Sequence, residues 1–530
     1  MSLEDLAPKR FLALTEAHLR RHVLSRRAAL AGIAATAIGG GSLHAQTPKR
    51  GGMLRVGRDQ EPDTLDPHKT SLAVANATMS MIHEPLARRD GDGKVAPGVA
   101  EGWEFRDNNA TVVFHLRKGV TFHDGSPCDA AACAFTVNRM LDKATASPTV
   151  FLLGPIDGVE VIDPLTVAYK FKQPFVPMWV GLTLAYCGIL PPGAVQKLGT
   201  GFGRAPVGAG PFRFVSWSPD GGIRFARNDA YTCGPVAWLD SVQLTQYPED
   251  ATRVAALQSG EINSIFTGQS VPLDRVRSLK GDGEVHIEQR VSQSTRALCF
   301  NQSLKPMDDL RVRKAICHGV DAGRVVALAL DGNASVAHGG LPSAVPGYDK
   351  RVEQLAYKYD PAKAKELLAA AGVAPGTELK LICNDTPSVR RSAEIVQAQL
   401  HDLGLNISVQ SMPIGQVVVL SRKKEHHIYF YTYAYPDADA LYIVFNSRSA
   451  LYRDYADDAD IDAWTEQSRV EFDDAKRQAL YDRVQERLVE QAHWAPLFEP
   501  LNFAAFDRSV QGATIRSDGD VDVTKIWLSA

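Results

Sequence analysis

The second half of this chain alternates between strand-like and helix-like segments, and this alternation restricts the possible folds more than any other feature. Asp360 and Pro361 match a helix N-cap and first turn, and Gly372 matches the end of that helix. A strand pattern over 379–383 and a helix pattern over about 388–403 follow. Alternating strands and helices are typical of an α/β layer, so we expect an α/β fold in this half.

The same alternation continues toward the C-terminus. A strand pattern covers 428–435, and a long amphipathic helix pattern covers roughly 461–491. The 530 residues, of which 45% are hydrophobic, are sufficient for more than one domain and a large buried core.

The first half is dominated by short alternating strands and turns. Three segment pairs flank turn residues and predict β-hairpins: 112–116 with 120–122, 159–161 with 167–171, and 212–214 with 223–225. A β-rich first half followed by an α/β second half, without an internal repeat, predicts two lobes.

The N-terminus has the layout of a signal peptide. Basic residues end at Ser25-Arg26-Arg27, and 28–43 contains no charged residue. The run from Ser25 to Leu30 resembles the twin-arginine export motif, and cleavage after Ala45 would fit. A membrane anchor is the alternative, but the uncharged run is shorter than the roughly 18 residues that span a bilayer. We therefore predict a signal peptide over 1–45 and a mature protein that is soluble in the periplasm.

Charge and motif content argue against several classes of function. The formal net charge of −3 makes nucleic acid an unfavourable partner. Motifs for nucleophilic catalysis, phosphate binding and dinucleotide binding are missing, so we predict no enzyme and no cofactor. His426 and His427 are adjacent and would point to opposite faces of a strand, so no metal site is predicted. The seven cysteines are odd in number, which leaves their pairing open.

Six stretches resemble, in order along the chain, the family of periplasmic dipeptide-, oligopeptide- and nickel-binding proteins of ABC importers, the family 5 extracellular solute-binding proteins. They are Leu65–Ser71 (LDPHKTS), Pro97–Met140 (starting PGVAEGWEF), Pro206–Trp217 (PVGAGPFRFVSW), Asp250–Asn263, Phe300–Ile316 and Tyr359–Gly372. Together they span nearly the whole chain after the leader.

This resemblance implies a Venus-flytrap architecture, in which two α/β lobes joined by a hinge close over a ligand. It implies lobe I at 46–82, 206–291 and 506–530, an additional β-rich domain at 83–205, and lobe II at 292–505. It also implies a monomer that binds a small peptide or peptide-like solute and delivers it to ABC permease subunits in the inner membrane.

Other functions remain open from the sequence. Within the family, the ligand could instead be an opine, an oligosaccharide, nickel or a metal chelate. Outside it, the alternatives are a periplasmic chaperone and a secreted hydrolase. A turnover assay identifies the hydrolase, and a defined one-to-one stoichiometry excludes the chaperone.

Candidate ligand-binding residues follow from the strand pattern, because ligands of open α/β sheets bind beyond the carboxyl ends of the strands. Period-two alternation places the tyrosines of 428–435 on one face, with Tyr433 and Tyr435 at the end of the strand and Asp437 and Asp439 in the following turn. Tyrosine offers a rigid face with one hydroxyl, and a carboxylate can hold a ligand ammonium. The alternative is that these side chains serve packing and a solvated turn.

Six further residues are candidates at strand ends and at the expected junction of the lobes: Thr70, Ser71, Arg296, Asn301, Asn384 and Thr386. Asn384 and Thr386 follow the strand 379–383 and would equally suit a helix N-cap. Arg296 could hold a ligand carboxylate with two parallel hydrogen bonds, and a surface ion pair is its alternative. Thr70 and Ser71 occupy a position that lines the cleft in the family that the chain resembles.

One position departs from the family pattern. The aspartate with which the family's peptide binders hold the ligand amino group falls near Ala434 in this chain. Either Asp437 or Asp439 takes that role through a shifted loop, or the ligand presents no free amine there.

Overall fold

The computed structural model describes residues 47–90, 93–219, 221–266, 270–449 and 455–529. Residues Pro48–Ala530 form one compact unit. The predicted signal peptide over 1–45 lies outside the described residues.

A single 12-stranded sheet organises this unit. Its C-terminal half-sheet contains β16 (Asn406–Met412), β15 (Glu378–Asn384), β17 (Ile428–Ala434) and β13 (Ser294–Phe300), in that order. Its N-terminal half-sheet contains β11 (Ser264–Ile265), β1 (Met53–Arg58), β10 (Ser241–Gln246), β9 (Gly222–Arg227) and β8 (Phe212–Ser218). The long strand β18 (Trp494–Asp507) lies between the two halves.

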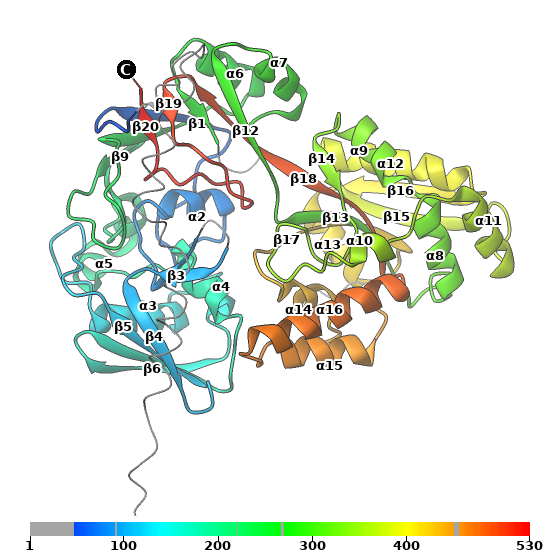
Figure 1. The fold of residues 1–530 in the computed structure, drawn as a ribbon, viewed down its shortest axis with the longest axis horizontal. Coiled ribbons are helices and arrows are strands. Elements are labelled where there is room, and N and C mark those ends of the chain that lie inside the picture. The colour runs from blue at the N-terminus through cyan, green and yellow to red at the C-terminus, as the bar shows by residue number, and fades with distance from the viewer. Residues whose placement is uncertain (1–46, 91–92, 220, 267–269, 450–454, 530) are drawn as a thin grey trace, which may run out of the picture. The chain divides into compact units, whose positions relative to one another are not determined.

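Strand β18 belongs to both half-sheets, as Figure 1 shows. Its first part pairs with β13 and with β14 (Ala334–Val336), and its second part, from Leu501, pairs with β12 (Val285–Val291). Only Ser292 and Gln293 separate β12 from β13, and the Ser292 amide donates to the carbonyl of Pro500 at 3.0 Å. The chain therefore crosses between the half-sheets at 292–293 and at 500–501.

Helices cover both faces of the C-terminal half-sheet because its strands bury side chains on both sides. Ile428 and Phe430 of β17 pack in a core with α8 (Leu310–Gly319), α9 (Ala322–Ala329), α11 (Pro361–Ala370) and α12 (Pro387–His401). Tyr429 and Tyr431 pack on the other face with α14 (Ala440–Phe445) and α16 (Asp474–Glu490). The predicted strands and helices between 360 and 435 are confirmed, and Asp360 caps α11 by accepting from the Lys363 amide at 2.9 Å.

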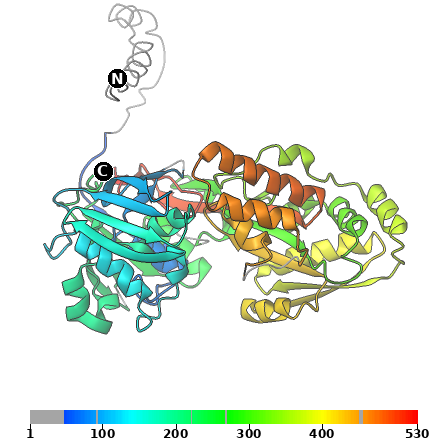
Figure 2. The ribbon, with the colours of Figure 1, turned by 90° about the horizontal axis from the view of Figure 1, so that it is seen from below.

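The helix predicted over 461–491 is wrong as a single element. Two helices occupy this region, α15 (Ala459–Ser468) and α16, and they lie side by side in Figures 1 and 2. The Asp473 side chain accepts hydrogen bonds from the amides of Ala475 and Lys476. This cap starts a new helix because it satisfies the first free amides of α16.

A separate four-stranded antiparallel sheet, drawn in cyan in Figure 2, has the order β4 (Ala100–Arg106), β5 (Thr111–Leu116), β7 (Thr166–Phe171) and β6 (Ile156–Asp163). The predicted hairpins at 159–171 and 212–225 are confirmed as β6–β7 and β8–β9. The predicted hairpin of 112–116 with 120–122 is wrong, because β5 pairs with β4 and β7 instead. The first half also contains helices, including α3 (Ala130–Leu141).

The remaining elements are α2 (Ala73–Met79), β2 (Ala87–Arg89), β3 (Val95–Pro97), α4 (Met178–Leu182), α5 (Pro192–Leu198), α6 (Asp250–Gln258), α7 (Val276–Lys280), α10 (Val352–Leu355), α13 (Ile414–Arg422), β19 (Val510–Gln511) and β20 (Trp527–Leu528). All seven cysteines are buried. Among the described residues, no helix combines the length and apolar character needed to cross a membrane, and no cluster of metal-ligating side chains occurs.

Candidate ligand-binding site

One edge of the C-terminal half-sheet gathers most of the predicted ligand-binding residues. Strands β15 and β17 are parallel and both end at this edge, while β13 is antiparallel to β17 and begins there. Asn384 is the last residue of β15, and Tyr433 and Arg296 lie within two residues of the strand ends. We call this region, with the turn that follows β17, the binding edge.

Stacked tyrosines line one face of the binding edge. The ring centroids of Tyr431 and Tyr433 lie 6.0 Å apart, those of Tyr433 and Tyr435 lie 6.2 Å apart, and both pairs are nearly parallel. The predicted alternation of the tyrosines is therefore confirmed. The Tyr433 hydroxyl is buried and has no hydrogen-bond partner among the described residues, and burial raises its pKa well above the ordinary value. A buried hydroxyl without a partner costs free energy that a ligand hydrogen bond would recover.

Arg296 is a partly buried cation near the start of β13. Its Nη1 donates to the hydroxyl of Ser294 and, at 3.1 Å, to the carbonyl of Thr295. Burial lowers the pKa of the guanidinium to about 10, and none of the described carboxylates forms an ion pair with it. The surface ion pair that the sequence left open as an alternative is not formed with any described residue.

Asp437 is already engaged by an arginine from β2. Its Oδ2 accepts from Nη2 of Arg89 at 3.1 Å, and its Oδ1 accepts from the amide of Asp439 at 3.0 Å. Both side chains of this ion pair are largely buried, with 20% of Arg89 and 25% of Asp437 exposed. The carboxylate is therefore neutralised before any ligand binds.

Asp439 is likewise held by a cation. Its Oδ1 lies 2.9 Å from Nε of Arg469, whose guanidinium stacks 3.8 Å from the ring centroid of Tyr442 and lies 5.0 Å from that of Phe175. The carbonyl of Arg469 accepts from the amide of Val176 at 2.8 Å. Burial raises the pKa of Asp439 to about 8, although Arg469 acts in the opposite direction. This carboxyl is thus a poor anchor for a ligand ammonium.

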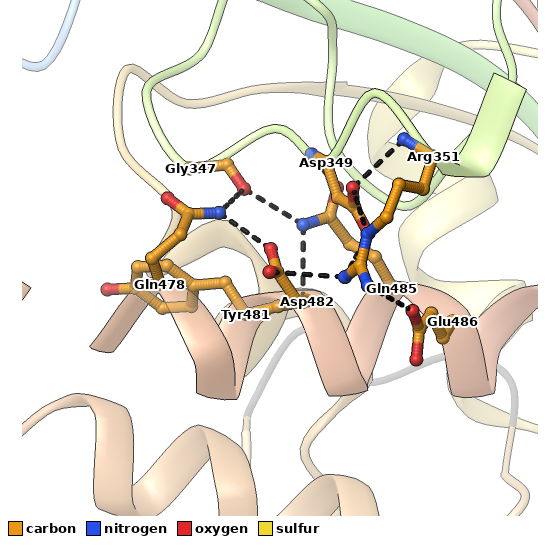
Figure 3. Close-up of polar contacts among 8 residues, drawn as sticks. All are labelled: Gly347, Asp349, Arg351, Gln478, Tyr481, Asp482, Gln485 and Glu486. Atoms are coloured by element: carbon orange, nitrogen blue, oxygen red, sulfur yellow. Dashed lines mark hydrogen bonds and ion pairs between the residues drawn. The ribbon is translucent and has the colours of Figure 1, made fainter. Parts of the chain in front are cut away.

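The turn that holds both aspartates rests on a loop fixed to α16. Gly347 has φ +98, and a Cβ at this position would lie 2.7 Å from Cβ of Ala438. The carbonyl of Gly347 accepts from the amide groups of Gln478 and Gln485, at 3.1 and 2.9 Å (Figure 3). Arg351 adds ion pairs to three carboxylates of the same region, Asp349, Asp482 and Glu486. This network sets the position of the turn after β17.

Asn384 ends β15, and Thr386 lies in the loop between β15 and α12. Oδ1 of Asn384 accepts from the amide of Thr386 at 3.0 Å. Thr386 occupies the N-cap position of α12, but its side chain makes no capping hydrogen bond and is exposed. Its hydroxyl therefore remains accessible at the binding edge.

Asn301 lies at the opposite end of β13 from the binding edge. Its side-chain amide donates to the carbonyls of Lys424 and His426, and its Oδ1 accepts from the amide and hydroxyl of Ser303. The residue is fully buried. These contacts join two loops, so Asn301 has a structural rather than a ligand-binding geometry.

Thr70 and Ser71 belong to a loop between β1 and α2. The Thr70 hydroxyl accepts from the amide of Leu72 at 3.1 Å, while Ser71 is exposed. His68 of the same loop and His83, which follows α2, are fully buried, and Nε2 of His83 lies 3.4 Å from the carbonyl oxygen of Leu65. Burial lowers the pKa of His68 to about 3 and that of His83 to about 4.

Two arginines that contact the binding edge, and a third at the end of β1, were not predicted. Arg89 and Arg469 contact the two aspartates, and nothing in the local sequence around them indicates these contacts. Arg58, the last residue of β1, is also buried, and Nη1 donates to the Thr78 hydroxyl at 2.8 Å. Arg58 could have been predicted from the sequence as a candidate, because it is a charged residue at the carboxyl end of a buried strand, where ligands of open α/β sheets bind.

The fold resembles that of solved bacterial binding proteins. HbpA2 from Haemophilus parasuis superposes with a TM-score of 0.83 at 24% identity, covering 90% of this chain and all of that one. The predicted α/β, two-lobed periplasmic binding protein fold is thereby confirmed.

Sequence comparison gives the family. The profile of the bacterial extracellular solute-binding proteins, family 5 (middle region), matches residues 94–452. The chain is 28% identical over 472 residues to the glutathione-binding protein GsiB of Salmonella paratyphi A, covering 86% of this chain and 90% of the relative. It is 28% identical over 509 residues to di/tripeptide-binding protein 2 of Pseudomonas aeruginosa, covering 90% and 94%. The chain therefore belongs to family 5 of the bacterial extracellular solute-binding proteins.

Proposed function

We propose that this protein is the substrate-binding subunit of an ABC importer and captures a small peptide or peptide-like solute. The observation that carries the proposal is the binding edge, which presents stacked tyrosines, a buried Tyr433 hydroxyl without a hydrogen-bond partner among the described residues, and an Arg296 guanidinium that forms no ion pair with them. The relatives named for binding glutathione and for binding di- and tripeptides support the same class of ligand.

The ligand binds between lobe I (46–82, 206–291 and 506–530) and lobe II (292–505), with 83–205 as an additional domain. Closure bends the chain where β12 meets β13 and in the middle of β18, because these are the strand connections between the half-sheets. Ligand drives closure only through its greater affinity for the closed state. Micromolar binding corresponds to about −8 kcal/mol, which a few charge-assisted hydrogen bonds and aromatic contacts in a closed cleft supply.

The protein acts in the periplasm as a soluble monomer after removal of 1–45 by a twin-arginine export route. Its closed form docks on permease subunits of the inner membrane, whose ATPase supplies the energy. The protein itself performs no bond chemistry, and the neutral hydroxyls and lone guanidinium of the binding edge suit recognition of a solute.

The test is ligand capture by the protein lacking residues 1–45. We expect native mass spectrometry with a pool of di- and tripeptides plus glutathione to show one bound ligand per chain, and titration calorimetry to give a micromolar Kd. A quench or shift of tryptophan fluorescence on binding would report closure. If no member of the pool binds while an opine, oligosaccharide or metal chelate does, the peptide assignment fails and the receptor function stands.

A further inference from the structure

We propose that the binding edge recognises an anionic group of the ligand, a carboxylate held by Arg296, and that none of its carboxylates captures a ligand amine. The ligand class is then that of small carboxylic acids, including peptide-like acids whose amino group is blocked or missing. This inference rests on the proposed function and specifies the chemistry of the same site.

The two aspartates of the turn after β17 already have arginine partners. Asp437 and Asp439 follow the strand end, where a ligand ammonium would need a free carboxylate. Each is already paired with an arginine, at 3.1 Å to Arg89 and at 2.9 Å to Arg469. A ligand ammonium would have to displace a guanidinium from a largely buried ion pair, and leaving that guanidinium unpaired is costly.

A third carboxylate near this edge is that of Asp385, in the loop between β15 and α12. Its side chain is exposed to solvent. An ion pair between exposed groups contributes little to affinity because water screens it. Asp385 therefore does not replace the two engaged aspartates as an amine anchor.

The Arg296 guanidinium is the cation at this edge that is available to a ligand. Whereas Asp437 and Asp439 each contact an arginine, Arg296 forms no ion pair with any described residue of the binding edge. Only Nη1 of Arg296 donates to described residues, so Nε and Nη2 keep donors for a ligand. A guanidinium presents its donors in a planar fork that matches a carboxylate with two parallel hydrogen bonds.

Thr432 is the cross-strand neighbour of Arg296 on the sheet. Arg296 pairs directly with Thr432 of β17, so both side chains lie on the same face. The Thr432 hydroxyl is buried and has no hydrogen-bond partner among the described residues. Arg296 and Thr432 together offer one cationic and one neutral group, a combination that suits a carboxylate.

The experiment compares three matched pools of di- and tripeptides by competition calorimetry: unmodified, N-acetylated and C-amidated. We expect the N-acetylated pool to bind within about threefold of the unmodified pool. We expect the C-amidated pool to bind at least roughly 30-fold more weakly, because it lacks the carboxylate. The reverse order, with C-amides bound and N-acetyl peptides rejected, would overturn the inference while the proposed function stands. Binding of none of the pools would instead count against the proposed function.

Variants assign the effect to Arg296. Arg296→Gln should weaken binding of the unmodified pool by roughly 30-fold and leave its residual affinity similar to that for the C-amidated pool. Arg296→Lys keeps the positive charge without the planar guanidinium and should lose less affinity for the unmodified pool than Arg296→Gln. The control is Arg390→Gln on α12, whose side chain is 58% exposed, and it should bind like the wild type. Unchanged affinity for free peptides in a folded Arg296→Gln protein refutes the role of this residue.

Discussion

Acid should destabilise this protein through two buried histidines, His68 and His83. Burial lowers the pKa of His68 from 6.5 to about 3 and that of His83 from 6.5 to about 4. In His68 the nearby Arg139 guanidinium acts in the same direction, whereas Asp66 opposes it. The folded protein therefore keeps both imidazoles neutral at a pH where the unfolded chain protonates them.

The sign and size of the effect follow from proton linkage. Because both folded pKa values lie below the unfolded value, the stability contribution is complete above pH 6.5 and is lost as the pH falls toward 4 and then 3. Each histidine contributes a slope of about 1.4 kcal/mol per pH unit within this window. Lowering the pH to about 5 should thus cost about 2 kcal/mol for each histidine.

The assay is urea unfolding followed by tryptophan fluorescence at about pH 7 and about pH 5. His68→Gln and His83→Gln remove one titrating group each, so each variant should lose about 2 kcal/mol less than the wild type between the two pH values. His401→Gln, at an exposed site, is the control and should follow the wild type. If the His68 and His83 variants keep the full wild-type pH dependence, the buried imidazoles are not its source.

Three further substitutions separate binding from stability. Tyr433→Phe should weaken ligand binding roughly tenfold in calorimetry without lowering the melting temperature, because the lost hydroxyl has no protein partner; a lower melting temperature would contradict this reading. Asn301→Ala should cost about 2–3 kcal/mol in urea unfolding, since its buried amide joins two loops, with ligand preference unchanged. Gly347→Ala should destabilise by about 2 kcal/mol or more and weaken binding, because its Cβ would meet Ala438 at 2.7 Å. Gly376→Ala, at φ +82 with open space, is the matched control and should cost about 1 kcal/mol.

Local sequence signals were sufficient to predict elements whose ends are marked by capping or turn residues. Asp360 and Gly372 bound α11 as expected, since a cap and a left-handed glycine act within a few residues. The hairpin at 112–122 failed because β5 finds its partners in β4 and β7, and the choice among strand partners depends on the tertiary fold. The single helix at 461–491 failed because the amphipathic period continues across a cap at Asp473.

The candidate binding site was likewise predictable from the sequence only in part. The carboxyl ends of β15 and β17 were predictable from strand order, and they bring Asn384, Tyr433 and Tyr435 to one edge. The state of Asp437 was not predictable, because its partner Arg89 lies 348 residues away in sequence. Sequence patterns identify which side chains reach an edge, whereas ion pairing across the fold decides which of them remain free to bind.

The shared strand β18 also fixes the order in which this protein can fold. Residues 494–507 lie between β13 and β11, so both half-sheets remain open until this strand is in place. Domains of most multidomain proteins fold one after another, from the N-terminus, as they are synthesised. Here neither half-sheet can be completed before nearly the whole chain has been made. A chain that stops before Trp494 should therefore yield two unfinished half-sheets rather than one folded half and one missing half.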